Sequence, residues 1–321
     1  MLFKISMKEY LRFIPLLIFI LTGCRDSQKS LRELVSENSI EVPGTGKPHN
    51  ILLGNGRFIF IPDLTGLQSS DCTLGTSSII HTGTDEKAHA IPNVCMVVFG
   101  EDGKRLSVNE FKRPLQNLNL WTAELKSRFE ADGVPVSVQT VCHPDYDMIS
   151  VRIVSGLLMR HRIMINIKMN GENFTSPNDN QFAGGRVGFN VMSDSQNVAM
   201  VKYAPDGLDH YLLLWKNSAE LTLSGNHELR IDPVKIDSVY SFSFLFMEDT
   251  ENGRVQNFGE TLFASSKSWE KYWTSPENSS VIRQLKSSVE IKRVLFELYR
   301  EKLKIKQSGL VNKLDSPVLR H

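Results

Sequence analysis

The sequence predicts a mainly β protein: a large antiparallel β-sandwich followed by a C-terminal helical segment. From residue 51 to about residue 249, short segments alternate apolar and polar residues, and turn residues separate them. β-Branched residues are frequent in these segments, as they are in pleated sheets. After residue 249 the apolar residues take up helical spacing instead.

Bulk composition fits an ordinary globular protein. The 321 residues are 41% hydrophobic and carry a formal net charge of +1, which allows a large core. A nearly neutral chain gives no reason to expect nucleic acid as a partner. No cofactor is expected either, because the sequence has no glycine-rich phosphate-binding loop of the Walker or Rossmann type.

Residues 1–23 predict a lipoprotein signal peptide. A basic region is followed by the apolar segment 13–21, which is too short to span a bilayer comfortably. The next residues, Leu21-Thr22-Gly23-Cys24, resemble the bacterial lipoprotein box, in which cleavage precedes the cysteine. An uncleaved anchor helix is the alternative. We therefore expect an exported protein, held at a cell-envelope membrane on its periplasmic or outer-surface side by lipid on Cys24.

A polar tether is expected over residues 24–49, with a short helix at most, before a sandwich domain over 50–257. The tether ends in a segment rich in proline and glycine. The three cysteines after Cys24 are widely spaced and match no metal-binding pattern. Because three is an odd number, at most one disulfide can form, and buried apolar thiols are favoured. These cysteines are Cys72, Cys95 and Cys142.

The stretch 53–68, LGNGRFIFIPDLTGLQ, opens the sandwich. Gly54-Asn55-Gly56 predicts a tight turn, since glycine and asparagine tolerate positive φ. A short strand should follow over 58–61 and end at Pro62, which cannot donate to a ladder. Further strands are expected over 92–99, 118–130, 134–143, 148–155, 161–169, 186–192, 198–203, 210–215, 219–223 and 239–247. Between them, 170–185 is expected to be a surface loop rather than a binding rim.

The helical segment is expected over 258–306, with a tail over 307–321. Its first helix should run from Phe258 to Trp273, and Ser275-Pro276 should break it. A second helix is expected over 281–304, where apolar residues recur at helical spacing.

Residues that could carry chemistry are few. His143, Asp145 and Asp147 lie on one predicted loop between strands, but a hydrogen-bonded turn in which Asp145 caps the backbone explains them better than a catalytic site. The sequence contains no nucleophile elbow, so no catalytic residue is assigned, and no metal site is expected. Tryptophan rings could stack on sugars, although core packing is the favoured explanation for each. These are Trp121, Trp215, Trp269 and Trp273.

Four segments resemble bacterial proteins related to glycoside hydrolase family 65, in the order in which that family has them. The first is GNGRFIFIPDLTGLQS, and the second is HPDYDMISVRIVS, which begins at His143. The third is SWEKYW, and the fourth is SSVEIKRVLFELY, which keeps only part of the family's linker-helix pattern. The resemblance covers residues 51–299.

The resemblance implies an N-terminal supersandwich (galactose mutarotase-like), then a linker helix and an (α/α)6 barrel that holds the catalytic glutamate. This chain ends where such a barrel would begin, so the resemblance implies a non-catalytic domain of a glycan-degrading lipoprotein, truncated or part of a split enzyme. A separately encoded barrel would then be a partner, together with a glycan or oligosaccharide. His143, Asp145 and Asp147 would line the rim of a sugar pocket. The alternatives are a free-standing glycan-binding lipoprotein and a hydrolase with an unrecognised site.

Overall fold

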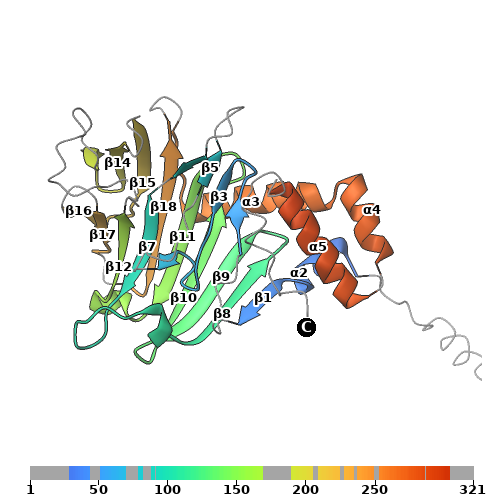
Figure 1. Cartoon of the computed structure of the whole chain (residues 1–321), viewed down its shortest axis with the longest axis horizontal. Coiled ribbons are helices and arrows are strands. Elements are labelled where there is room, and N and C mark those ends of the chain that lie inside the picture. The colour runs from blue at the N-terminus through green and yellow to red at the C-terminus, as the bar shows by residue number, and fades with distance from the viewer. Residues whose placement is uncertain are drawn as a thin grey trace, which may run out of the picture.

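The structure is a β-sandwich with helices gathered along one side (Figure 1). It is a computed structural model that describes residues 29–43, 51–69, 79–81, 88–90, 92–168, 189–204, 209–224, 228–234, 237–248, 253–285 and 287–303. The predicted fold class is confirmed, because large antiparallel sheets make up most of this part of the chain and helices follow them. Cys24, Cys72 and the 170–185 loop lie outside the described residues.

The largest sheet has nine strands, and every neighbouring pair in it is antiparallel. In spatial order they are β1 (Ile40–Pro43), β8 (Lys112–Asn119), β9 (Glu124–Ala131), β10 (Val134–Cys142), β11 (Met148–Ser155), β18 (Val239–Met247), β15 (His210–Trp215), β14 (Val198–Tyr203) and β13 (Asn190–Asp194).

Two smaller sheets complete the β structure. The five-stranded sheet has the order β16 (Glu220–Ser224), β17 (Glu228–Asp232), β12 (Ile163–Lys168), β7 (Asn93–Val98) and β4 (Gln68–Ser69). The four-stranded sheet consists of β2 (Leu53–Gly54), β3 (Phe58–Phe60), β5 (Ile79–His81) and β6 (Ala88–Ala90). Short 3-10 helices follow β7 and β11, at Val108–Glu110 and Leu158–Arg160.

One hydrophobic core joins these sheets. Strands of the large sheet alternate buried and more exposed residues, so one face of the sheet turns inward. Aromatic rings bridge the layers: Phe60 of β3 lies 5.8 Å from Phe244 of β18, and Phe58 lies 5.9 Å from Phe246. We call the opposite face of the nine-stranded sheet, which points away from this core, its outer face.

The turn after β3 is anchored to the inward-facing side of the large sheet. Gly66 has φ of +79°, and its carbonyl accepts a 2.6 Å hydrogen bond from Thr140 Oγ1. Gln116 Nε2 donates to the Asp63 carbonyl at 2.7 Å. The stretch 53–68 therefore does more than form a strand between two turns, since its second turn is packed inside the sandwich.

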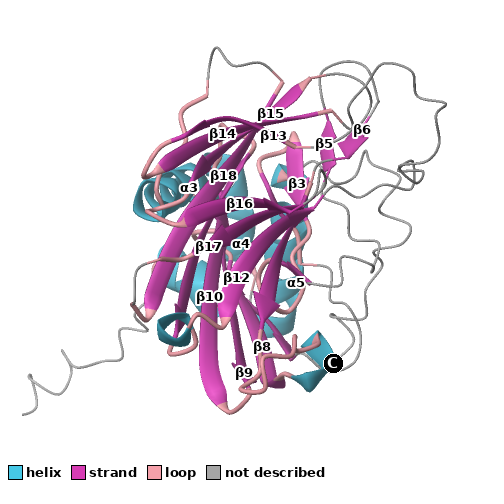
Figure 2. Ribbon diagram, turned by 90° about the vertical axis from the view of Figure 1, so that its left-hand side faces the viewer, coloured by secondary structure: helices cyan, strands magenta, loops and turns pink. Residues whose placement is uncertain are grey.

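Helix α3 (Phe258–Trp273) crosses the outer face of the nine-stranded sheet and packs on β10 and β11. Thr261 and Ser150 share a hydrogen bond of 2.6 Å between their buried hydroxyls. In the middle of α3, Ser265 Oγ donates to the Thr122 carbonyl at 2.8 Å, and at the end of the helix Trp273 Nε1 donates to the Leu120 carbonyl at 2.8 Å. The helix thus closes the turn between β8 and β9. Figure 2 shows the strands in front of the helices from this second direction.

The predicted second helix, 281–304, is wrong as a single element. Two helices occupy the region, α4 (Pro276–Gln284) and α5 (Ser288–Lys302). The backbone is extended at Leu285 and Ser287, with ψ of 137° and 133°, which interrupts the helical hydrogen bonds. Pro276 does not interrupt α4, because it lies in the first turn of that helix, where its missing N–H costs little.

The predicted polar tether also needs correction. Helix α2 (Leu31–Glu37) has a capping box formed by Ser30 and Glu33, and β1 pairs with β8. Leu31, Val35 and Val42 are buried in the core. Leu34 and Ile40 are partly buried against the same core. Residues 31–42 therefore belong to the sandwich, because burial of these apolar side chains attaches the stretch to it.

Two smaller expectations fail as well. The predicted strand 118–130 is a hairpin, with a turn between β8 and β9 where Ala123 has φ of +51°. Cys95 is buried but disulfide-bonded, whereas Cys142 is a buried free thiol, so the favoured state holds for only one of them. Among the described residues, no helix is long and apolar enough to cross a membrane.

Candidate functional site

The three predicted rim residues lie on one loop between β10 and β11. His143 is 3% exposed, and its Nδ1 accepts hydrogen bonds from the backbone N–H groups of Asp145 at 3.1 Å and Tyr146 at 3.2 Å. The Asp145 side chain is exposed. The predicted hydrogen-bonded turn is therefore present, but His143 rather than Asp145 supplies the acceptor.

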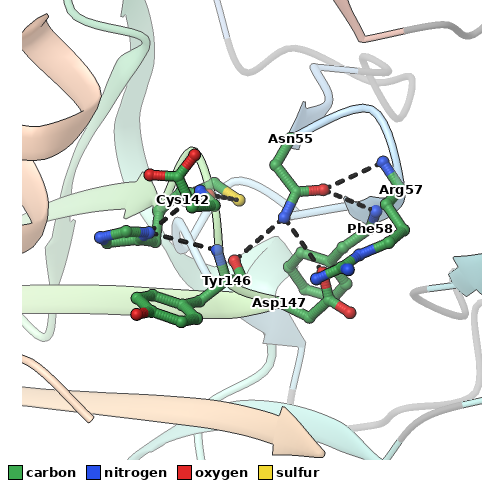
Figure 3. A network of polar contacts seen from close by, with 8 residues as sticks. Asn55, Arg57, Phe58, Cys142, Tyr146 and Asp147 are labelled. Carbon is green, nitrogen blue, oxygen red and sulfur yellow. Dashed lines mark hydrogen bonds and ion pairs between the residues drawn. The ribbon is translucent and has the colours of Figure 1, made fainter. Parts of the chain in front are cut away.

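Asn55, from the turn before β3, ties that loop to the four-stranded sheet (Figure 3). Its Oδ1 accepts from the backbone N–H groups of Arg57 at 3.0 Å and Phe58 at 2.8 Å. Its Nδ2 donates to the Tyr146 carbonyl and to Asp147 Oδ1, both at 3.0 Å. One amide side chain thus closes its own turn and holds a second one.

Asp147 is also paired with Arg57. Arg57 Nε and Nη2 donate to Asp147 Oδ1 at 3.2 Å and 3.0 Å. The side chain of Asp147 is only 12% exposed, whereas that of Arg57 is 56% exposed. Because charge-assisted bonds and the Asn55 amide converge on one carboxylate oxygen, Asp147 serves chiefly to hold the two turns together.

Electrostatics at this loop favour a neutral imidazole. Burial lowers the pKa of His143 below its ordinary value of 6.5, and the nearby Asp145 carboxylate and a hydrogen bond with Gln256 oppose the shift. Geometry agrees, since Nδ1 can accept two N–H bonds only when it carries no proton. His143 in this arrangement is a turn-forming acceptor.

The C-terminal helices reach the same region through aromatic side chains. The rings of Trp269 on α3 and Tyr299 on α5 stack at 4.8 Å. Tyr299 OH donates a 2.6 Å hydrogen bond to the carbonyl of Leu52, just before β2. Tyr299 is 1% exposed, and burial raises the pKa of its hydroxyl, so the hydroxyl remains a donor at neutral pH.

Lys302, the last residue of α5, lies over this aromatic group. Its Nζ is 3.9 Å from the centroid of the Trp269 ring and 5.2 Å from that of Tyr272, and it donates to Ser268 Oγ at 3.1 Å. Burial lowers the pKa of Lys302 to about 8, and Asp145 opposes the shift. Both rings attract the ammonium, which keeps the end of α5 close to α3.

We call this meeting place of the Asn55 turn, the His143–Asp147 loop and helices α3 and α5 the sandwich–helix junction. His143, Asp145 and Asp147 are brought together as the sequence predicts. The other residues of the junction, Asn55, Arg57, Tyr299 and Lys302, were not predicted from the sequence. All but Lys302 lie within segments that resemble the family, but nothing in a single sequence pairs residues so far apart. No group of three or more histidine, cysteine or acidic side chains within the described ranges could hold a metal ion.

Comparison with known proteins gives distant structural likenesses. No protein-family model and no curated protein matches the sequence. A solved structure described as a putative kojibiose phosphorylase from the human microbiome matches 76% of this chain and 37% of its own, with a TM-score of 0.42 and 8% identity. A bacterial glucoamylase complexed with acarbose matches 78% and 39%, with a TM-score of 0.41 and 8% identity.

A third similar structure is the family GH92 α-mannosidase from Bacteroides thetaiotaomicron. It matches 86% of this chain and 41% of its own, with a TM-score of 0.35 and 10% identity. This chain therefore spans about two fifths of the length of these proteins. At such identities and scores, the likeness assigns no activity to this chain.

Proposed function

We propose that this chain contributes the non-catalytic sandwich domain of a glycoside hydrolase-like lipoprotein that takes part in glycan degradation. One observation carries the proposal: the four segments that resemble that family come together at the sandwich–helix junction. Asn55 of the first segment binds Asp147 of the second, Trp269 of the third stacks on Tyr299 of the fourth, and Tyr299 reaches back to Leu52. Each segment alone resembles the family only in part, but their assembly into one structural unit supports the resemblance.

The chemistry of the junction supports a non-catalytic role. Glycosidases commonly use two carboxyl groups about 5–10 Å apart on either side of the scissile bond. Asp147 is held by Asn55 and Arg57, and Nδ1 of His143 is engaged by the backbone. These bonds give both side chains a structural task in the loop. We assign the rim contact with sugar to the exposed Asp145, and to His143 and Asp147 the task of fixing the loop that carries it.

A split enzyme would need a second component. In this proposal an (α/α)6 barrel, encoded separately, supplies the catalytic glutamate and docks against the helical side of the sandwich. Phe263 of α3 and Val289 of α5 are 66% and 70% exposed there, so apolar side chains are available to such a partner. Lipid on Cys24 would hold the pair at the membrane.

The experiment is a hydrolysis and binding panel with the purified full chain in detergent. Across α- and β-linked oligosaccharides we expect binding to some glycans without release of reducing ends. Replacing Asp145 with Asn should weaken that binding, whereas Glu297→Gln on the exposed side of α5 should not. Hydrolysis by the chain alone would refute the non-catalytic role.

A free-standing glycan-binding lipoprotein is the second candidate. It is favoured by Trp215, which is partly exposed at the end of β15, whereas the other tryptophans are buried. Mixing the chain with barrel proteins encoded next to it distinguishes the two candidates. If none of them binds the chain or becomes active with it, the free-standing binding protein is the better description. Restored hydrolysis in the mixture would establish the split enzyme.

A further inference from the structure

The outer face of the nine-stranded sheet carries a second candidate site, beside the part that α3 covers. Along β9, β10 and β11, side chains that point into the core are buried, and those between them point outward. Helix α3 covers the row that contains Ser150 and Ser243. The next row on the same face, two residues after Ser150 along β11, holds Lys126, Gln139 and Arg152.

Strand register places these side chains beside one another. Lys126 pairs with Gln139, and Gln139 pairs with Arg152, while Arg128 pairs with Ser137 in the following row. Neighbouring strands lie about 4.8 Å apart, so the backbones at Lys126 and Arg152 are about 10 Å apart. Arg128 stands two residues along β9, about 7 Å from Lys126. We call Lys126, Arg128, Gln139 and Arg152 the cationic face.

Within the described part of the chain, the three cations of this face form no ion pair. Two acidic side chains of β9 flank the face. Glu130 pairs with Arg113 at 2.8 Å, outside the face, and Glu124 accepts a hydrogen bond from Gln139 of the face. A flat surface with three unpaired positive charges attracts anions.

Trp215 borders the same face. Ser241 is in register with Arg152, and Trp215 is in register with Ser243, two residues from Ser241 on the same side of β18. Trp215 and Ser241 are diagonal neighbours on adjacent strands, so the Trp215 ring can reach toward Ser241, one strand away from Arg152. The expected core packing holds for Trp121, Trp269 and Trp273, which are at most 6% exposed, but Trp215 keeps part of its surface open.

We propose that the cationic face, with Trp215 at its edge, binds an acidic polysaccharide. Carboxylate or sulfate groups would meet Lys126, Arg128 and Arg152, and the arginine forks can bind such groups in a bidentate manner. The Trp215 ring would meet the apolar C–H face of a pyranose. The choice of a glycan as the anion rests on the proposed function, whereas the charge and register of the face do not.

Affinity electrophoresis of the full chain tests this proposal, with polygalacturonate, a neutral glucan and poly-glutamate as probes. We expect retardation by polygalacturonate that weakens as salt is raised, because exposed charges are screened. The triple variant Lys126→Gln, Arg128→Gln, Arg152→Gln should bind polygalacturonate about tenfold more weakly. The control Lys271→Gln, Arg283→Gln, Lys292→Gln removes the same charge from exposed helix positions and should bind normally.

Trp215→Ala separates sugar recognition from charge alone. It should weaken binding to polygalacturonate severalfold and leave any binding to poly-glutamate unchanged. Equal binding by the two triple variants would overturn the cationic face, and equal binding of both polyanions with no effect of Trp215→Ala would overturn the sugar. Neither result bears on the proposed function. That function is tested separately, by the effect of Asp145→Asn on binding to other glycans. Folding of every variant is checked by its urea midpoint.

Discussion

Asn55 and Asp147 are 92 positions apart in the sequence, yet Asn55 Nδ2 donates to Asp147 Oδ1 at 3.0 Å. This bond joins the turn before β3 to the loop after β10, two segments that lie far apart in the sequence. Asn55 also binds the backbone at Arg57, Phe58 and Tyr146, so both N–H groups and the oxygen of its side-chain amide are engaged in hydrogen bonds.

Asn55→Ala should therefore destabilise the protein. The substitution removes all of these hydrogen bonds and leaves partly buried groups without partners, so we expect a loss of about 2–3 kcal/mol in the free energy of unfolding. Urea unfolding measures it. Asn109→Ala, at an exposed asparagine, is the matched control and should change stability by no more than about 0.5 kcal/mol. Equal effects of the two substitutions would contradict the role given to Asn55.

Gly66→Ala tests the packing of the 53–68 stretch inside the sandwich. A Cβ at Gly66 would lie 3.1 Å from Ser127 Oγ and from Val138 Cγ1, and φ is +79°. Gly133→Ala shares the positive φ, +74°, but its Cβ would meet nothing within 4 Å. Both variants lose about 1 kcal/mol to backbone strain, and Gly66→Ala should lose a further 1–3 kcal/mol, roughly, from crowding. Similar urea midpoints for the two would show that the turn is not confined.

Stability should depend on pH through His143. Its pKa is lowered in the folded state, so between that value and 6.5 the unfolded chain binds more protons than the folded one. The contribution is fully present above pH 6.5 and is lost as pH falls through this window. His143→Asn keeps an acceptor near the Nδ1 position without titrating, so its stability should fall less between pH 7.5 and pH 5.

Urea unfolding of the wild type and His143→Asn at the two pH values measures this difference. His161→Asn is the control, because His161 is exposed and its φ of +52° suits asparagine. If His161→Asn flattens the pH dependence as much as His143→Asn does, His143 is not its source.

Tyr299→Phe should loosen helix α5. The Leu52 carbonyl would lose the partner that now binds it at 2.6 Å, at a cost of about 1–3 kcal/mol for a buried acceptor. Hydrogen exchange should quicken in α5 more than in β10 and β11, because the bond holds the helix rather than the sheet. Tyr211→Phe, at a partly exposed tyrosine, serves as the control and should leave exchange in α5 unchanged.

Local patterns predicted much of the fold. Strands β14, β15 and β18 match their expected ranges, since alternation and β-branched residues mark them clearly, and α3 begins and ends where expected. The break between α4 and α5 was hidden, because apolar spacing continues across Leu285 while the backbone turns extended. Strand β1 was missed because its place at the edge of the large sheet depends on pairing with β8.

The candidate site shows the limit of sequence reasoning more sharply. His143, Asp145 and Asp147 are close in sequence, so their common loop was predictable. Asn55 and Lys302 reach that loop only through the fold, and no spacing rule connects them to it. The cationic face likewise depends on register: Lys126 and Arg152 become neighbours of Gln139 only when β9, β10 and β11 pair as they do.

Reducing-end release from a glycan that the purified full chain binds is the most direct test of the central claim, that this chain is a non-catalytic glycan-binding domain. We predict that the chain retards the glycan in affinity electrophoresis while the amount of reducing ends stays at the level of the buffer control. Release of reducing ends in proportion to the amount of chain, lost in a boiled sample, would contradict the claim.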